Sequence, residues 1–218
     1  MGLVEIVYND INEYLSKVNS GLFFNERDFQ MHLATYLKES GHYDDVDLEY
    51  YVPYTILEDY YWETELRLDI VVMKDGEYLP IELKYKTNTF NRSISRFGEQ
   101  LEGVEILKKQ GAQNLACYDF WKDVKRIELV RKRFNAVKHG LAVFVTNDKS
   151  YWNGSSKTKS SYYQFNLNEG IHGTSKHWIN TVEIPKGRPD FDLDNEYSIS
   201  WKESKYGDVL FNFFIISV

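Results

Sequence analysis

The chain has 218 residues, enough for one large domain or two small ones. Its formal net charge of −7 argues against a general nucleic-acid coat protein, and its single cysteine, Cys117, excludes both an internal disulfide framework and a site built from several thiolates. No apolar run approaches the ~20 residues that span a bilayer, and the N-terminus is unlike a signal peptide. We therefore expect a cytoplasmic protein without a membrane partner.

Two amphipathic helices are predicted near the N-terminus. The first covers Leu3 to Val18, and the second covers Glu26 to Ser40 after an N-cap at Asn25. Glu26 falls in the first turn of the second helix, where a carboxylate interacts favourably with the helix dipole. It could instead reach a metal ion or a water near the strands that follow. The residues alone leave both roles of Glu26 open.

A strand from Val46 to Tyr54 and a hairpin from Arg67 to Lys84 come next. The hairpin has two apolar, β-branched runs on either side of Asp75-Gly76, which is a strong signal for a two-residue turn. This turn places Lys74 opposite Glu77. The same register places Asp69 opposite Glu82, on one face of the hairpin, with Lys84 pointing the same way.

Two carboxylates in this apolar hairpin predict a cation site. Asp69 and Glu82 would repel each other if both were charged and half-buried, and a divalent cation between them removes the conflict. Oxygen ligands suit Mg²⁺ or Mn²⁺. Lys84 would then lie beside the metal, where it could hold a phosphate oxygen or polarise a water. This combination is typical of phosphodiester hydrolysis.

The middle of the chain is predicted to be helical and basic. We expect helices over Arg92 to Lys109 and over Ala112 to Phe134. The stretch from Lys84 to Lys138 holds 13 Lys and Arg against six Asp and Glu. Lys122 and Arg126 in the second helix could contact nucleic-acid phosphates, or could only form ion pairs within their own helix. The basic stretch could equally be the solvated face of long helices.

The last third of the chain is rich in predicted strands. Gly140 to Thr146 is a buried strand that is expected to run parallel to a hairpin strand. Tyr197 to Trp201 and Val209 to Val218 are further strand candidates. We expect one α/β domain over residues 1–218, with a core of about 25–146 and a β-rich C-terminal elaboration over about 147–218.

The order of these elements resembles the PD-(D/E)XK, or restriction-endonuclease-like, nuclease superfamily. The resemblance covers about residues 25 to 146 and rests on Asp69 and on Glu82-Leu83-Lys84, although Leu68 replaces the proline of the family name. It implies a mixed central sheet flanked by helices, with Mg²⁺ or Mn²⁺ held by Asp69, Glu82 and the Leu83 carbonyl. It also implies that Lys84 helps to activate the attacking water and that Glu26 adds a ligand.

The resemblance leads us to expect a metal-dependent nuclease with nucleic acid, DNA above all, as its substrate. The alternative is a catalytically inactive module of the same fold that binds DNA or a protein partner in a defence or repair complex; a homodimer is compatible with either. In a third, purely structural interpretation, Asp69 and Glu82 face solvent and pair with Arg67 and Lys84, which contributes only ~0.2–1 kcal/mol.

Overall fold

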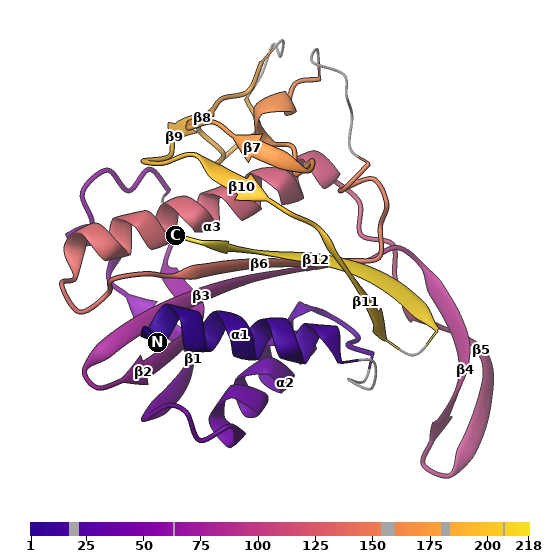
Figure 1. Ribbon diagram of the computed structural model, residues 1–218. Coiled ribbons are helices and arrows are strands. Elements are labelled where there is room, and N and C mark those ends of the chain that lie inside the picture. The colour runs from indigo at the N-terminus through magenta and orange to yellow at the C-terminus, as the bar shows by residue number, and fades with distance from the viewer. Residues whose placement is uncertain (18–21, 63, 154–159, 180–183, 207) are drawn as a thin grey trace.

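The computed structural model describes residues 1–17, 22–62, 64–153, 160–179, 184–206 and 208–218. It is a mixed α/β structure built on a six-stranded sheet with the strand order β1-β2-β3-β6-β12-β11. Helices α1 and α2 cover one face of this sheet and α3 covers the other (Figure 1). The sheet strands are β1 (Asp45–Val52), β2 (Leu66–Lys74), β3 (Glu77–Lys86), β6 (Leu141–Thr146), β11 (Lys202–Tyr206) and β12 (Val209–Ser217).

The two N-terminal helices form where the apolar spacing predicts them. Helix α1 spans Leu3–Ser16 and α2 spans Glu26–Glu39; residue 18, the expected end of the first helix, lies outside the described residues. Asn25 is the N-cap of α2, and its side chain accepts a hydrogen bond of 2.9 Å from the Asp28 N–H. Glu26 is therefore fixed at the first position of α2, next to the sheet.

The β2–β3 hairpin has the predicted turn. Asp75 and Gly76 both have positive φ angles, 51° and 78°, as a type I′ turn requires. Pairing runs from Lys74↔Glu77 to Ile70↔Ile81 in the predicted register. Strand β6 pairs with β3 in parallel, which confirms the predicted direction of the Gly140 to Thr146 strand.

The prediction of a helix over Arg92 to Lys109 is wrong. This stretch forms a hairpin of β4 (Phe90–Arg96) and β5 (Glu99–Leu107), joined by Phe97 and Gly98. Its apolar residues recur every three or four positions, which suggested one helix face, but of those residues only Leu107 is buried. Gly98 and Gly103 have positive φ angles of 85° and 63°, conformations that interrupt a right-handed helix.

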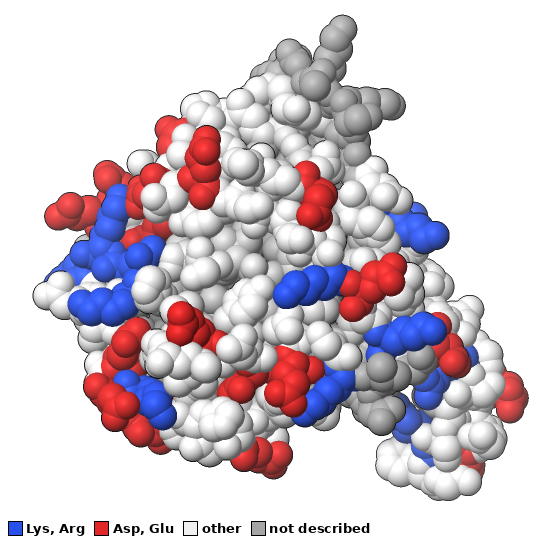
Figure 2. Space-filling model, viewed as in Figure 1, with Lys and Arg blue, Asp and Glu red and all other residues white. Residues whose placement is uncertain are grey.

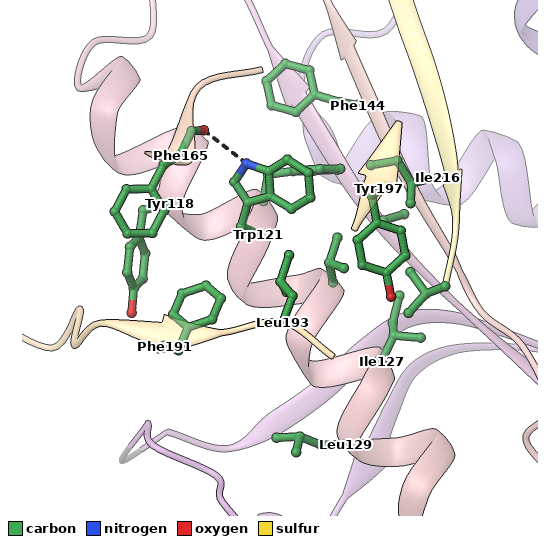
Figure 3. Close-up of a cluster of buried hydrophobic side chains, with 14 of the residues drawn as sticks. Tyr118, Trp121, Ile127, Leu129, Phe144, Phe165, Phe191, Leu193, Tyr197 and Ile216 are labelled. Carbon is green, nitrogen blue, oxygen red and sulfur yellow. Dashed lines mark hydrogen bonds between the residues drawn. The ribbon is translucent and has the colours of Figure 1, made fainter. Parts of the chain in front are cut away.

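The C-terminal segment covers the outer side of α3 (Gln113–Arg133) and also completes the sheet. Strands β12 and β11 extend the sheet beyond β6, so residues 147–218 are more than an elaboration of a core that ends near residue 146. Phe165, Phe191 and Tyr197 pack against α3, and the Trp121 indole donates a hydrogen bond of 3.0 Å to the Phe165 carbonyl (Figure 3). Helix α3 is consequently buried on nearly all sides.

The remaining elements of the C-terminal segment are short. They are a 3-10 turn at Tyr163–Phe165 and the strands β7 (Gly170–His172), β8 (Ser175–Lys176), β9 (Phe191–Asp192) and β10 (Tyr197–Ile199). Strand β10 pairs with β7, and β8 pairs with β9. A further 3-10 turn, Tyr54–Ile56, follows β1. Of the helices in the described ranges, none is both long and apolar enough to cross a membrane.

Gly140, which precedes β6, tests the close packing of α3 on the sheet. A Cβ atom at this position would lie 2.3 Å from Ile127 Cγ2 and 3.1 Å from both Pro80 Cγ and the Pro80 carbonyl oxygen. We expect Gly140→Ala to lower the free energy of unfolding by about 1–3 kcal/mol, because the added methyl overpacks a filled core. Chemical denaturation measures the change. Gly111→Ala, where the methyl would meet nothing within 4 Å, is the control; equal stability of both variants would contradict this packing.

Candidate active site at the divergence of β2 and β3

The candidate site begins where the side-chain alternation of β2 slips by one residue. Leu68 and Val71 both pack on the α3 face of the sheet, whereas Ile70 and Val72 pack on the α1/α2 face. A regular strand places Leu68 and Ile70 on the same face, so the slip falls at Asp69. The described β2–β3 ladder ends at Ile70↔Ile81, and Asp69 and Glu82 are not the ladder pair that the sequence predicted.

Gln30 of α2 supports the backbone at this slip. Its buried side-chain amide donates hydrogen bonds of 2.7 Å to the Asp69 carbonyl and 2.9 Å to the Glu49 carboxylate. Glu49 lies on the neighbouring strand β1 and has a positive φ of 52°. The amide therefore satisfies a carbonyl beside the interruption of the sheet. Sequence reasoning did not single out Gln30, because its role depends on the slip.

Two carboxylates accept hydrogen bonds from β3 beyond the end of the ladder. The Leu83 N–H donates to Asp69 Oδ2 at 2.7 Å, and the Tyr85 N–H donates to Glu26 Oε2 at 2.8 Å. Since Leu83 and Tyr85 are two residues apart, their N–H groups point to the same edge of β3. The structure thus brings Glu26 and Asp69 to one edge of the same strand, although they are 43 positions apart in the chain.

Glu82 is the most deeply buried acid predicted for the site. The residue is 4% exposed, and its Oε1 atom has no hydrogen-bond partner among the described residues. Burial, with the nearby Asp123 and Asp69 carboxylates, raises the pKa of Glu82 well above its ordinary value. Burial also raises the pKa of Asp69 to about 6, against the opposing effects of Lys84 and the Leu83 N–H. The Asp69 carboxylate thus lies near enough to Glu82 to raise its pKa.

Lys84 balances this group of acids. Its ammonium forms an ion pair with Asp123 of α3 and donates a hydrogen bond of 3.2 Å to the Leu83 carbonyl. Burial disfavours the charge of Lys84, but Asp123, Glu26, Asp69 and Glu82 together raise its pKa above the ordinary value. Lys84 therefore stays charged and contacts the Leu83 carbonyl, which was predicted to be a metal ligand.

Asp123 is the site residue whose burial the sequence did not indicate. It is 2% exposed, and although burial opposes its charge, Lys84, Lys122 and Arg126 hold its pKa below the ordinary value. The spacing of Asp119, Lys122, Asp123 and Arg126 is typical of an exposed helix face. Asp123 is covered because α3 packs on the sheet, where its carboxylate forms ion pairs with Lys84 of β3 and with Arg126.

The two cations predicted to contact nucleic acid both form the ion pairs that were the alternative. Lys122 Nζ lies 3.6 Å from Asp119 Oδ1, and Arg126 NH1 lies 3.4 Å from Asp123 Oδ1. The Arg126 side chain is 11% exposed and also donates to the Thr64 hydroxyl at 3.2 Å. Lys122 is the more accessible of the two, with 20% of its side chain exposed.

The solvent-facing interpretation of the acids does not agree with the structure. Arg67 pairs with the exposed Glu65 at 3.0 Å, while Lys84 turns inward to Asp123. In the part of the chain that the structure describes, no three or more His, Cys, Asp or Glu side chains form a ready metal-binding group. The carboxylates predicted to be ligands, Asp69 and Glu82 with Glu26 added, therefore do not form such a group. The unpartnered Glu82 oxygen and the hard oxygen donors fit Mg²⁺ or Mn²⁺.

Comparison of the chain with models of protein families, with curated proteins and with solved structures finds no match.

Proposed function

We propose that this protein is a metal-dependent nuclease that hydrolyses phosphodiester bonds of nucleic acid, with DNA as the expected substrate. The observation that carries the proposal is the convergence of Asp69, Glu82 and Lys84 in one buried group, with a Glu82 oxygen left without a hydrogen bond. Buried acids with raised pKa values are costly to the fold and gather at functional sites. Their position beside the divergence of β2 and β3 supports the restriction-endonuclease-like arrangement implied by the sequence.

The residues divide into ligands and positioning groups. Asp69, Glu82 and the Leu83 carbonyl would hold Mg²⁺ or Mn²⁺, which when bound supplies a Lewis acid and lowers the pKa of a bound water. Lys84 supplies a positive charge where negative charge develops on the attacked phosphate, and Asp123 positions its ammonium. Glu26 accepts a hydrogen bond from the Tyr85 N–H of β3 with one carboxylate oxygen, and its other oxygen would bind a water or the metal ion.

A cleavage assay tests the proposal. Purified protein is incubated with Mg²⁺ or Mn²⁺ and with single- or double-stranded DNA or RNA, and Lys84→Ala is the inactive control. We expect cleavage that chelation with EDTA removes and that the variant lacks. Failure of the wild-type protein to cleave any of these substrates, under conditions in which the metal binds, would contradict nuclease activity.

A second candidate function is a binding module without catalysis, and one observation favours it. Lys84 already satisfies Asp123 and the Leu83 carbonyl, and β3 N–H groups satisfy Asp69 and Glu26, so most of the site is stable without a metal. In this case the protein binds DNA or a protein partner, in the cytoplasm that its single thiol favours. Tight Mn²⁺-independent binding of nucleic acid together with no cleavage would select this candidate.

Lys122 and Arg126 each form an ion pair with a different aspartate, and we expect different effects when each is replaced. Lys122 is paired at 3.6 Å to a partly exposed acid, so a phosphate can replace that partner. We expect Lys122→Gln to reduce the slope of log K against log salt for duplex DNA by about 0.9. Arg126→Gln instead removes a buried partner of Asp123 and should destabilise the fold. Binding titrations at several salt concentrations, with denaturation as the fold control, separate the two; an unchanged slope for Lys122→Gln excludes a phosphate contact.

A further inference from the structure

A polar cavity lies in the C-terminal segment, on the outer side of α3. The 3-10 turn at Tyr163–Phe165 and the strands β7 and β8 contribute to its lining, and both strands lie above α3 in Figure 1. Its volume is about 440 Å³, within the range of cavities that hold small ligands. None of its lining residues belongs to the candidate active site, so its polar groups need an explanation of their own.

Lys176 places a buried positive charge at this cavity. The residue is 1% exposed, and its Nζ donates a hydrogen bond of 2.6 Å to the Gly173 carbonyl. The same Nζ lies 4.3 Å from the centre of the Trp121 ring. Among the residues that the structure describes, no carboxylate forms an ion pair with Lys176. Buried charges in proteins are ordinarily paired with an opposite charge, and this one is not.

The contacts that Lys176 makes do not compensate for its burial. Burial lowers the pKa of Lys176 to about 8, although the Asp192 and Glu128 carboxylates act in the opposite direction. The Gly173 carbonyl uses one of the three N–H donors of the ammonium, and the Trp121 ring carries no net negative charge. An anion in the cavity would supply the missing partner.

Asn168 gives the same cavity an unsatisfied acceptor. Its Oδ1 atom is buried and has no hydrogen-bond partner among the described residues. The Asn168 carbonyl lies 2.8 Å from His172 Nε2, and the centre of the His172 ring lies 5.2 Å from that of Trp121, the ring that Lys176 also contacts. The unsatisfied acceptor and the buried cation therefore belong to one contiguous group. A ligand that satisfies both carries an acidic oxygen and an O–H or N–H donor.

The other charges near the cavity leave the partner of Lys176 missing. Glu169 also lines the cavity, but it is exposed and accepts a hydrogen bond of 2.8 Å from the Trp201 N–H. His172 has a lowered pKa because it is buried and close to Lys176, so its ring stays neutral at pH 7. The surface over β7 to β10, at the top of Figure 2, is mostly uncharged with a few acidic side chains. Attraction for an anion therefore comes from inside the cavity.

We propose that this cavity binds a small oxyanion that carries its own hydrogen-bond donor, with Lys176 holding the charge and Asn168 accepting from the donor. A phosphate with a P–O–H group and a hydroxycarboxylate share this chemistry. The inference does not depend on the proposed nuclease function, because the two sites have no residue in common. It gives the C-terminal segment a binding role in addition to covering α3.

Titration of ¹⁵N-labelled protein with matched anions tests the inference. The reporter is the indole N–H of Trp121, because Lys176 lies on its ring. The probes are inorganic phosphate and lactate, which carry an O–H donor, and sulfate and propionate, which have nearly the same shapes without it. We expect a saturable shift with phosphate or lactate, and the probe that binds identifies the ligand class. Its counterpart without the donor should bind about 2- to 10-fold more weakly, the effect of one hydrogen bond.

Two variants assign the contacts. Lys176→Met keeps the alkyl chain and should weaken binding about 10- to 150-fold, the range for a hydrogen bond to a charged group. Asn168→Ala should keep the binding of sulfate and propionate but remove the preference for the probes with a donor. Lys205→Met, at an exposed lysine of β11, is the control and should change nothing. Denaturation curves check that each variant is folded.

The pH dependence of binding needs no variant. An anion binds the charged ammonium, and this charge is lost as the pH rises through the Lys176 pKa of about 8. Lactate and phosphate hardly change their own charge between pH 8 and pH 9, so the affinity should fall about fivefold over this interval. The inference is overturned if none of the four anions binds at millimolar concentrations, if Lys176→Met binds them as the wild-type protein does, or if the affinity is equal at pH 8 and pH 9. Equal affinity for probes with and without the donor would overturn the role of Asn168.

Discussion

Lys84→Met lowers the free energy of unfolding by about 3–5 kcal/mol at pH 8, the expected cost of removing one partner from a buried ion pair. The variant keeps the alkyl chain but leaves Asp123, Glu82 and Asp69 without their shared cation. Their pKa values then rise further, and the folded protein binds more protons than the unfolded chain. The loss of stability therefore shrinks as the pH is lowered and the acids become neutral. Denaturant titrations at several pH values measure it.

Two further variants show whether the effect belongs to the buried pair. Lys86→Met removes the same side-chain type from the same strand, but Lys86 lies 3.7 Å from the partly exposed Glu26, so we expect a change below about 1 kcal/mol. Adding Asp123→Asn to Lys84→Met should restore much of the lost stability, because the uncompensated charge is removed. Equal stabilities of Lys84→Met and the wild-type protein would contradict the ion pair.

Glu82→Gln has the opposite effect on stability, and we expect a gain of about 1–3 kcal/mol at pH 8. The pKa of Glu82 is raised in the folded protein, so the folded state resists ionisation that the unfolded chain undergoes freely. This penalty is absent below the ordinary value of 4.5 and grows as the pH rises above it. The amide carries no charge and offers an N–H donor to the neighbouring acids.

The same Glu82→Gln substitution should remove the metal ligand and lower the cleavage rate by at least about 100-fold, as expected for an electrostatic group at a catalytic centre. Higher stability with lower activity is the pattern of a residue kept for function. Glu105→Gln on the exposed hairpin is the control for the substitution itself. The account is contradicted if Glu82→Gln lowers the free energy of unfolding at pH 8, or changes it equally at pH 4 and pH 8. Either result would show that ionisation of Glu82 does not destabilise the folded protein.

Local sequence signals were sufficient for the β2–β3 hairpin and for the N-terminal helices. Asp75-Gly76 fixes the turn and, through it, the register of the apolar strands, while Asn25 fixes the start of α2. Asp69, Glu82 and Lys84 were found because that register relates them. The exact opposition of Asp69 and Glu82 was not predicted correctly, since the slip at Asp69 depends on Gln30 and the neighbouring strand.

Long-range packing explains what the sequence did not reveal. Asp123 sits among charges at ordinary surface spacing, and its burial depends on a distant residue, Lys84 of β3, with which its carboxylate pairs. The hairpin tip at Phe97 was misassigned because apolar residues at helical spacing are usually buried, whereas here only Leu107 of that set is buried. Sequence periodicity reports an apolar face but does not report whether anything covers that face.

Calorimetric titration of the wild-type protein with Mn²⁺ at pH 6, in buffers of different ionisation enthalpy, tests the central claim most directly. Asp69 has a pKa of about 6 and that of Glu82 is raised, so both acids must lose protons when they become ligands. We predict binding with proton release, and no binding by Asp69→Asn. No binding heat with the wild-type protein, or the same affinity for Asp69→Asn, would contradict a metal site at the divergence of β2 and β3.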